Sequence, residues 1–308
     1  MKLLISGGNG FLGSHIVKKA LEGGFEVTVV DDLSTMQTKN LSEKVTLIRK
    51  KVEDFKSDEK FDYVLHFAAR PSPEDYIIHP VDTILSNSIG TLNMLKIAKN
   101  SGAVFLYTSS SEVYGNASIL PTPETYFGYV NPNGIRSCYD EGKRYSEALI
   151  MSYYREYKID VRIERPFNVY GPGIRPDGLY GRVIPRFILN ALKGEDLPIF
   201  GDGNQTRSFL FIDDWVDATW KLLRSTEMSG EVVNIGSVTE VTINALAKSI
   251  IDLAGSHSKI VHLDAREDDP YRRSADITKI RKLLGWEPKV PLEVGLAKTI
   301  KWVREKYL

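Results

Sequence analysis

The sequence predicts an α/β protein with a doubly wound parallel sheet, followed by a smaller C-terminal α/β lobe. Three observations support this fold class. Apolar runs of strand length alternate with helical patterns in the first half of the chain. A glycine-rich turn joins the first apolar run to the first helix, and two aspartates end the second run. Continuous apolar runs of this kind are typical of parallel strands that are buried on both faces.

The first elements form a βαβ unit over residues 2–31. KLLIS is a strand-like apolar run that leads into GGNGFLG. Leu12, Ile16 and Ala20 then recur at helical spacing, and two glycines end the helix. The run FEVTVV predicts the second strand, which reaches Asp31.

The glycine turn predicts a dinucleotide site. Gly7 allows a tight turn, Gly10 lets backbone approach a pyrophosphate, and Gly13 lets the helix pack on the strand. Asp31 stands where an acidic residue accepts hydrogen bonds from the adenosine ribose. Its charge would repel a 2′-phosphate, so the sequence favours NAD over NADP.

The later elements continue the alternation. VTLI, YVLHFAA, VFLYTSS and VRIER read as buried strands, and helices are expected over about residues 81–99 and 139–157. His66 lies within an apolar strand and is interpreted as a structural histidine. The five histidines show no metal-ligand spacing, so no metal site is predicted.

From Pro166 the pattern changes. PFNVYGPGIRPDGLYGR is rich in glycine and proline and reads as loop, and IPRFILNALKG reads as an amphipathic helix. We expect a Rossmann domain over residues 1–165, rejoined by about 209–236, and a second lobe made mainly of residues 166–308.

Composition narrows the possible partners. Forty Lys and Arg balance forty Asp and Glu, which argues against nucleic acid and anionic membrane surfaces. The single cysteine, Cys138, excludes an internal disulfide, and no apolar run approaches a membrane span. With no signal peptide evident, a soluble cytoplasmic protein is expected.

Tyr139 and Lys143 form the clearest catalytic pattern. They lie four residues apart on an expected helix, and therefore on one face. A neighbouring cation favours the charged form of a phenol and lowers its pKa. The segment YTSSSEVYG leaves the carboxyl end of an expected strand, which is where open α/β sheets bind ligands.

GGNGFLG, SSSEVYG and YDEGK together resemble the extended short-chain dehydrogenase/reductase family. PFNVYGPG, FGDGNQTRSF and LGWEPKVPLEVGL extend the likeness nearly to the end of the chain. The resemblance implies that Tyr139 takes a proton from a sugar hydroxyl while hydride passes to NAD. It also implies that Lys143 lowers the pKa of Tyr139 and holds the nicotinamide ribose, while Ser110 hydrogen-bonds the same hydroxyl.

The resemblance further implies two sets of binding residues. The expected cofactor contacts are Gly7, Gly10, Phe11, Leu12, Asp31, Asp32, Ser34, Val52, Phe67, Ala68, Ala69, Thr108, Tyr139, Lys143 and Pro166. The expected substrate contacts are Asn168, Arg182, Val183, Phe200, Arg207 and Arg273. Arginines suit a diphosphate because their planar guanidinium forks bind phosphate oxygens in pairs.

Within this family, the residues that follow the expected strand VFLYTSS differ between enzymes that catalyse different reactions. A 4,6-dehydratase carries an Asp-Glu pair whose aspartate protonates the leaving hydroxyl, whereas this chain has Ser111 and Glu112. A serine hydroxyl is far too weak an acid for that role. RPSPEDY, NPNGIRSCYDEGKR and DDPYRRSAD resemble UDP-glucuronate decarboxylases, which implies catalytic roles for Ser110, Ser111, Glu112 and Arg273.

The alternatives stay open on sequence alone. A nucleotide-sugar 4-epimerase, acting on UDP-glucose or UDP-glucuronate, shares the oxidation step. A non-catalytic NAD-binding regulator is disfavoured because Tyr139 and Lys143 are both present. Lys51 stands where many similar proteins have an aspartate that faces the adenine. Arg70 replaces a small residue at the cleft, and we expect it to alter sugar preference.

The last expectation concerns the oligomeric state of the protein. The two long helices carry apolar residues on more than one face, whereas a helix that packs only on a sheet shows one stripe. These residues include Ile84, Leu92, Leu95, Leu149, Ile150 and Tyr153. A homodimer joined by two helices from each subunit is expected, as in similar proteins.

Overall fold

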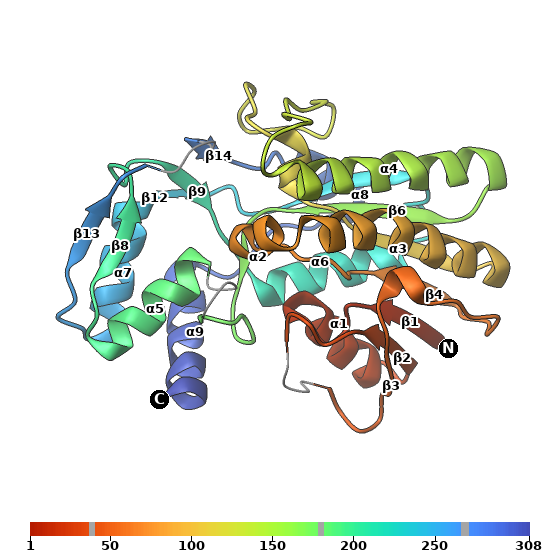
Figure 1. The fold of residues 1–308 in the computed structure, drawn as a ribbon, viewed down its shortest axis with the longest axis horizontal. Coiled ribbons are helices and arrows are strands. Elements are labelled where there is room, and N and C mark those ends of the chain that lie inside the picture. The colour runs from red at the N-terminus through yellow and green to blue at the C-terminus, as the bar shows by residue number, and fades with distance from the viewer. Residues whose placement is uncertain (37–40, 178–181, 266–270) are drawn as a thin grey trace. The chain divides into compact units, whose positions relative to one another are not determined.

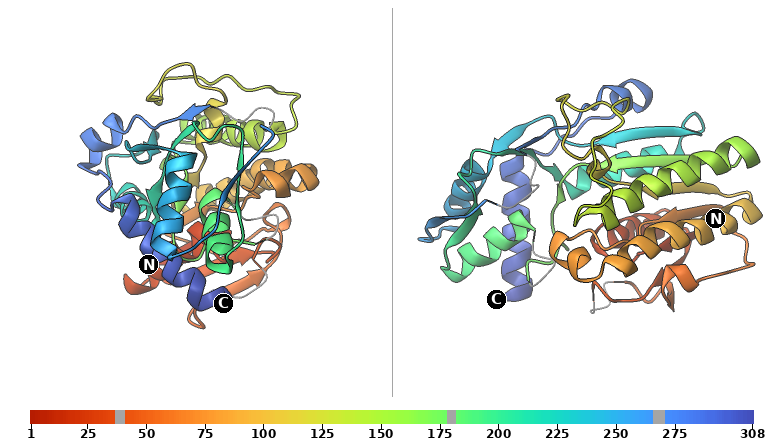
Figure 2. Two further views of the ribbon diagram at one scale, coloured as in Figure 1. Left: turned by 90° about the vertical axis from the view of Figure 1, so that its left-hand side faces the viewer. Right: turned by 45° about the horizontal axis from the view of Figure 1, so that its top comes forward.

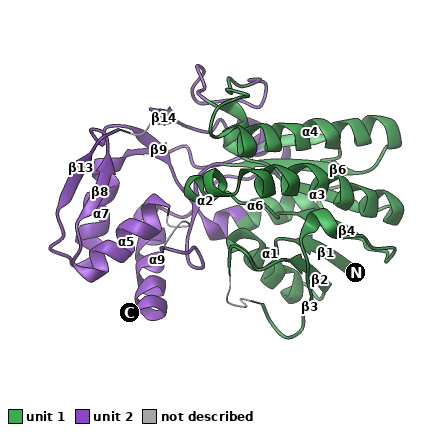
Figure 3. Cartoon of the chain, in the orientation of Figure 1, with its two compact units in different colours: residues 1–115, 128–166, 216–233 green, residues 116–127, 167–215, 234–308 purple. Residues whose placement is uncertain are grey.

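The structure is a computed structural model that describes residues 1–36, 41–177, 182–265 and 271–308. The chain forms two compact units, which Figure 3 colours separately. Unit 1 contains residues 1–115, 128–166 and 216–233, and unit 2 contains residues 116–127, 167–215 and 234–308.

Unit 1 is built on a parallel sheet with helices around it (Figure 1). Its strands are β1 (Lys2–Ser6), β2 (Glu26–Asp31), β3 (Thr46–Arg49), β4 (Tyr63–His66), β5 (Val104–Thr108), β6 (Val161–Pro166) and the first part of β11 (Glu231–Ile235). Its helices are α1 (Phe11–Glu22), η1 (Val52–Asp54), α2 (Pro73–Ile78), α3 (Pro80–Ser101), η2 (Ser111–Tyr114), α4 (Ser137–Tyr157) and most of α6 (Ile212–Arg224).

The strand order places a reversal at the centre of the sheet. The order is β11-β6-β5-β4-β1-β2-β3, and each pairing between neighbours from β6 to β3 is parallel. The chain moves outward from β1 to β2 and β3, and then returns to place β4 on the other side of β1. Ligands of open α/β sheets bind at such a switch point, outside the carboxyl ends of the strands. The predicted fold class is confirmed.

The core of unit 1 explains why these segments form strands and helices. Leu3, Leu4 and Ile5 of β1 are fully buried, as are Phe105 and Leu106 of β5. Burial of apolar side chains on both faces of the sheet is the main source of its stability.

Helices α3 and α4 lie side by side, as the views of Figures 1 and 2 show. The hydroxyls of Thr91 and Ser146 are 3.0 Å apart between them. Gly142 lies so close to Asn87 that an added Cβ would be 3.2 Å from the Cβ of Asn87. These small residues let the two helices approach closely.

Unit 2 consists of short strands and helices. Its strands are β7 (Val169–Tyr170), β8 (Leu197–Phe200), β9 (Thr206–Ser208), β10 (Leu210–Phe211), β12 (Glu240–Thr242), β13 (Ile260–Leu263) and β14 (Arg272–Arg273). Its helices are α5 (Val183–Lys193), α7 (Ile243–Ala254), α8 (Thr278–Leu284) and α9 (Leu292–Tyr307). The order β12-β9-β14 forms one small sheet, and β8 pairs in parallel with β13.

Two short elements were not expected from the sequence. The segment PFNVYGPG, interpreted as loop, contains the two-residue strand β7, and RPSPEDY, for which no element was predicted, contains the start of the short helix α2. Both are too short to carry a hydrophobic period. Residues 268–270 of DDPYRRSAD and residues 178–181 of the glycine-rich segment lie outside the described residues.

Candidate active site

The glycine turn between β1 and α1 is closely packed. The amide of Gly7 donates to Val30 O at 2.9 Å, and the amide of Gly10 donates to Gly7 O at 3.2 Å. A Cβ at Gly7 would lie 2.6 Å from the amide nitrogen of Ala68, just after β4. A Cβ at Gly13 would overlap Gly7 O and lie 2.8 Å from the Cα of Gly8. Only glycine allows the first turn of α1 to sit this close to the end of β1.

Gly10 differs from the other two. Its φ of −71° is ordinary for any residue, and among the described residues an added Cβ would lie within 4 Å of Gly7 O alone, at 3.3 Å. The space beyond Gly10 is therefore open along the N-terminus of α1. Open backbone at a helix N-terminus is the environment that a pyrophosphate requires.

Asp31 ends β2 next to this turn. Its Oδ2 accepts the amide of Asn9 at 2.9 Å, and its Oδ1 accepts the amide of Leu33 at 2.9 Å. Burial raises the pKa of Asp31, and the two amides oppose that shift. Asp32 accepts both the amide and the hydroxyl of Ser34. The turn, the open backbone at Gly10 and the acid at the strand end fit NAD.

The other expected cofactor residues surround the same edge. Phe67, Ala68 and Ala69 follow β4, Phe11 and Leu12 begin α1, Val52 begins η1, Thr108 ends β5 and Pro166 ends β6. Lys51, which departs from similar proteins at the adenine contact, forms an ion pair with Asp82 at 2.9 Å.

The catalytic candidates gather after β5. Ser110 caps η2, and its Oγ accepts the amide of Glu112 at 3.2 Å. Ser111 and Glu112 form the first turn of η2. Glu112 Oε2 lies 2.5 Å from Nη2 of Arg136, which immediately precedes α4. The Glu112 carboxylate is therefore held by a cation three residues before Tyr139.

Tyr139 and Lys143 lie one turn apart on α4, as the spacing predicts, and both are buried. Lys143 Nζ donates to Thr108 O at 2.8 Å and lies 5.8 Å from the Tyr139 ring centroid. Burial lowers the pKa of Lys143 from 10.5 to about 7, while Glu147 and Glu164 oppose that shift. The charge on Lys143 at neutral pH thus depends on nearby carboxylates.

Two residues near Tyr139 escaped the sequence reasoning. Tyr76 of α2 stacks on Tyr139 with ring centroids 5.3 Å apart and planes 9° apart. Arg136 binds Glu112, as described above. Arg136 could have been noticed in NPNGIRSCYDEGKR, but nothing in the sequence pairs it with a residue 24 positions earlier.

Arg70 acts locally. Its Nη1 lies 2.9 and 3.0 Å from the two carboxylate oxygens of Asp75, which is fully buried. This ion pair connects the end of the loop after β4 to α2, and α2 carries Tyr76. The suggestion that Arg70 alters sugar preference stays a prediction.

The expected substrate residues lie in unit 2. Asn168 precedes β7 and donates to Ser208 O at 3.0 Å. Arg182 immediately precedes α5, Val183 begins it, and Phe200 ends β8. Arg207 and Arg273 are register partners in the parallel pair β9 and β14, so their side chains lie on one face. Both are 9% exposed.

Arg272 differs from its neighbour Arg273. It is exposed and forms an ion pair with Glu240 at 2.6 Å. The structure thus brings Arg207 and Arg273 together and separates Arg272 from them.

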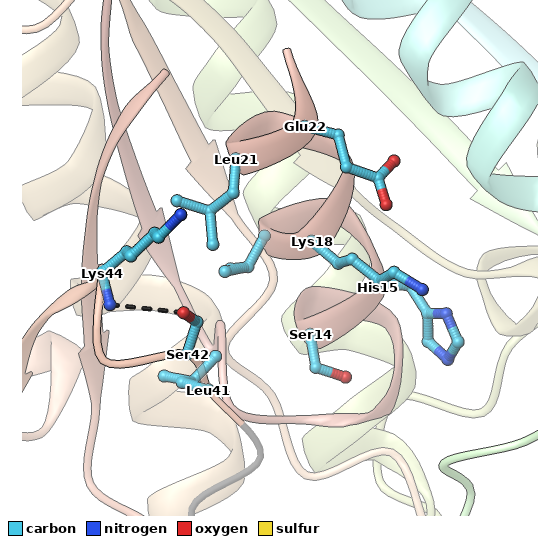
Figure 4. Close-up of a pocket in the computed structure, with 9 residues that line it drawn as sticks. Ser14, His15, Lys18, Leu21, Glu22, Leu41, Ser42 and Lys44 are labelled. Atoms are coloured by element: carbon cyan, nitrogen blue, oxygen red, sulfur yellow. Dashed lines mark hydrogen bonds between the residues drawn. The ribbon is translucent and has the colours of Figure 1, made fainter. Parts of the chain in front are cut away.

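A pocket of about 560 Å³ lies elsewhere, beside α1 (Figure 4). It is lined by Ser14, His15, Val17, Lys18, Leu21, Glu22, Leu41, Ser42 and Lys44. The amide of Lys44 donates to Ser42 Oγ at 3.3 Å, which shapes the loop side of the pocket. None of the predicted site residues lines it.

Two kinds of feature are absent from the residues that the structure describes. In that part of the chain no group of three or more His, Cys, Asp or Glu side chains could hold a metal ion. No helix among the same residues has the length and apolar character needed to cross a membrane.

Known proteins resemble the chain along its whole length. The family model described as "NAD dependent epimerase/dehydratase family" matches residues 3–236. UDP-glucuronic acid decarboxylase 1 of Xenopus tropicalis is 43% identical over 310 residues, which cover 99% of this chain and 72% of that protein. UDP-glucuronic acid decarboxylase 5 of Arabidopsis thaliana is 45% identical over 302 residues, which cover 96% of this chain and 87% of that protein.

Solved structures agree on the fold. UDP-glucose 4-epimerase of Thermotoga maritima, solved with UDP-glucose, has a TM-score of 0.92 and 32% identity, with 100% of both chains covered. UDP-glucuronic acid 4-epimerase of Bacillus cereus, solved with UDP-glucuronic acid and NAD, has a TM-score of 0.89 and 28% identity, again covering 100% of both chains.

Proposed function

The chain belongs to the NAD dependent epimerase/dehydratase family, and we propose that it converts UDP-glucuronate to UDP-xylose and carbon dioxide. The observation that carries this proposal is the 43–45% identity to UDP-glucuronic acid decarboxylases over 96–99% of the chain. Ser111 and Glu112 support it, because a dehydratase needs an acid at the position of Ser111.

NAD is the cofactor, and when bound it accepts a hydride from C4 of the sugar and later returns it. The residues present fit it, as the open backbone at Gly10 and the acid at Asp31 show. In our proposal the backbone from Gly7 to Leu12 holds the pyrophosphate, and Asp31 accepts the adenosine ribose hydroxyls.

Tyr139 removes the proton from the C4 hydroxyl, and Ser110 hydrogen-bonds the same hydroxyl. The Lys143 ammonium favours the phenolate of Tyr139, because an opposite charge nearby stabilises an anion. Its contact with Thr108 O keeps it beneath the ring. These are positions from which general base catalysis at the sugar is possible.

Carbon dioxide leaves because a ketone at C4 makes the C5 carboxylate a β-keto acid. The bond between C5 and the carboxyl carbon breaks, and its electron pair forms an enolate. Glu112, held by Arg136, passes a proton from solvent to C5, where it replaces the lost carboxyl group. Tyr139 returns its proton to the C4 oxygen, which regenerates the alcohol.

The nucleotide diphosphate and sugar contact unit 2 in this proposal. Arg207 and Arg273 support the assignment, because two guanidinium groups on one face suit a diphosphate or a carboxylate. Asn168, Arg182, Val183 and Phe200 are the other proposed contacts, and residues 166–308 form most of this lobe.

We also propose a homodimer joined through α3 and α4. Val81, Ile84 and Ile89 on α3 and Tyr145 on α4 are exposed by 40–66% of their surface. Leu95 and Ile150 are fully buried in the core of unit 1 and do not contribute to this surface, contrary to the sequence interpretation.

The deciding experiment incubates the enzyme with UDP-glucuronate and follows carbon dioxide and the product mass. A product lighter by carbon dioxide, without net formation of NADH, is expected. Tyr139→Phe should abolish turnover, and Glu112→Gln should slow it by about 10² to 10⁴, because each removes a positioned acid/base. An unchanged mass with inversion at C4 would show a 4-epimerase instead.

A further inference from the structure

A carboxylate that the proposed mechanism leaves unused lies near the end of β6. Glu164 is fully buried and is the register partner of Thr108 in the parallel pair of β5 and β6. Glu164 Oε1 accepts the hydroxyl of Thr108 at 2.7 Å, and Oε2 accepts the hydroxyl of Thr219 from α6 at 2.7 Å. Both oxygens are acceptors, as an ionised carboxylate requires.

Thr108 connects this carboxylate to Lys143. Its hydroxyl donates to Glu164, and its carbonyl oxygen accepts Lys143 Nζ at 2.8 Å. Lys143 is 2% exposed. A buried ammonium is costly unless an anion lies nearby, and a buried carboxylate is costly unless a cation lies nearby. One threonine therefore joins two buried groups of opposite charge.

The remaining groups that face Lys143 come from three elements. Tyr107 of β5 has its ring centroid 4.7 Å from Nζ, and Tyr139 of α4 has its centroid at 5.8 Å. Burial, with the charge of Lys143, lowers the pKa of His66 in β4 to about 3, so its ring is neutral at physiological pH. None of these three supplies a resting negative charge when Tyr139 is protonated.

Glu147, one turn after Lys143 on α4, is the other carboxylate. It is already bound by Arg165, with Nη2 at 2.5 Å and Nε at 2.9 Å, and by the hydroxyl of Ser109 at 2.5 Å. Arg165 offsets much of its charge. Of the two carboxylates, Glu147 raises the pKa of Lys143 more than Glu164 does. The hydroxyls of Thr108 and Thr219 that bind Glu164 carry no charge, so neither hydroxyl offsets the field of Glu164 at Lys143 in the way that Arg165 offsets the field of Glu147.

We propose that Glu164 is a positioning residue, a buried counter-charge that acts through its contact with Thr108 to keep Lys143 an ammonium beneath Tyr139. This inference rests on the proposed function, in which Lys143 acts on Tyr139 as a cation. Glu164 touches neither substrate nor cofactor in this scheme. It sets the pH range in which the Tyr139 and Lys143 pair works.

Glu164→Gln removes the charge and keeps the shape. Without the anion, Lys143 loses its proton more readily, so its titration midpoint moves to lower pH. A shift of roughly one to three pH units is expected for a close opposite charge. Asp160→Asn is the matched control, because Asp160 precedes the same strand and pairs with Arg162 at 3.0 Å, away from Lys143.

The readout is the NMR titration of the Lys143 side chain in protein labelled at the lysine ε-carbon, with the signal assigned by Lys143→Met. The wild-type midpoint should lie near pH 7. Glu164→Gln should lower that midpoint, and Asp160→Asn should leave it in place. An unchanged midpoint in folded Glu164→Gln protein would overturn the proposal.

A reciprocal measurement tests the same proposal without Glu164→Gln, in case that variant does not fold. Two coupled groups shift each other equally, so Lys143→Met should raise the titration midpoint of the Glu164 carboxyl carbon. A Glu164 signal that does not respond to Lys143→Met would equally overturn the proposal.

The pH dependence of enzyme activity provides a third test of the role of Glu164. If UDP-glucuronate is turned over, the alkaline limb of the pH profile of kcat/KM should move to lower pH in Glu164→Gln, because Lys143 loses its proton more readily. A purely structural role would lower the rate without moving that limb. If wild-type protein does not turn over UDP-glucuronate, the proposed function fails, and the two NMR titrations still decide the role of Glu164.

Discussion

Two glycines of the same GGNGFLG segment should affect different properties of the protein when each is changed to alanine. Gly13→Ala should weaken folding and Gly10→Ala should weaken NAD binding. The structural difference is the nearest neighbour of the added methyl. At Gly13 it overlaps Gly7 O and lies 2.8 Å from the Cα of Gly8, whereas at Gly10 it meets one atom at 3.3 Å.

The magnitude for Gly13→Ala follows from two opposing effects. Overpacking costs typically about 1 to 3 kcal/mol, and the upper end applies because the neighbours are backbone atoms that cannot rotate away. Alanine is favoured over glycine within a helix by about 1 kcal/mol. The net loss in the free energy of unfolding should be about 2 kcal/mol.

Gly10→Ala should change the free energy of unfolding by less than about 1 kcal/mol, because alanine adopts the φ of −71° without strain. Its methyl projects into the open space at the N-terminus of α1. If that space receives the pyrophosphate, NAD affinity should fall at least about tenfold, which equals about 1.4 kcal/mol.

The assays are urea unfolding of NAD-free protein, followed by tryptophan fluorescence, and titration calorimetry with NAD. NAD must be absent during unfolding, because a ligand that binds only the folded state raises apparent stability. Wild-type NAD affinity in Gly10→Ala would refute the close backbone approach at that position. Wild-type stability in Gly13→Ala would refute the packing argument.

Two further predictions concern titration and assembly. Because the pKa of His66 is lowered to about 3 and rises to its ordinary value of about 6.5 on unfolding, its contribution to stability is present above pH 6.5 and is lost as pH falls. That loss should reach about 2 kcal/mol at pH 5, and His66→Asn should remove this part of the pH dependence in urea unfolding; a His66 ring signal that titrates near pH 6.5 would contradict it. Ile84→Glu combined with Ile89→Glu should convert a dimer to monomer in light scattering, while Val294→Glu, at an exposed apolar site on α9, should not. A wild-type protein that is monomeric at micromolar concentration would refute the dimer.

Much of this protein was determined by local sequence. The βαβ unit follows from the period of its apolar residues and from three glycines within one turn. Tyr139 and Lys143 share a helix face because they are four residues apart, whatever the rest of the chain does. Such features depend on spacing along one segment, and spacing is visible in the sequence.

Tertiary structure decided the surroundings of that pair. Thr108 meets Glu164 only because β5 and β6 are parallel neighbours in one register, and Arg136 meets Glu112 only because α4 begins beside η2. The burial that lowers the pKa of Lys143 to about 7 likewise comes from the strands and helices packed around it. Charge and hydrogen-bond energies depend on distance and solvent exposure, and both are set by contacts between segments far apart in the chain.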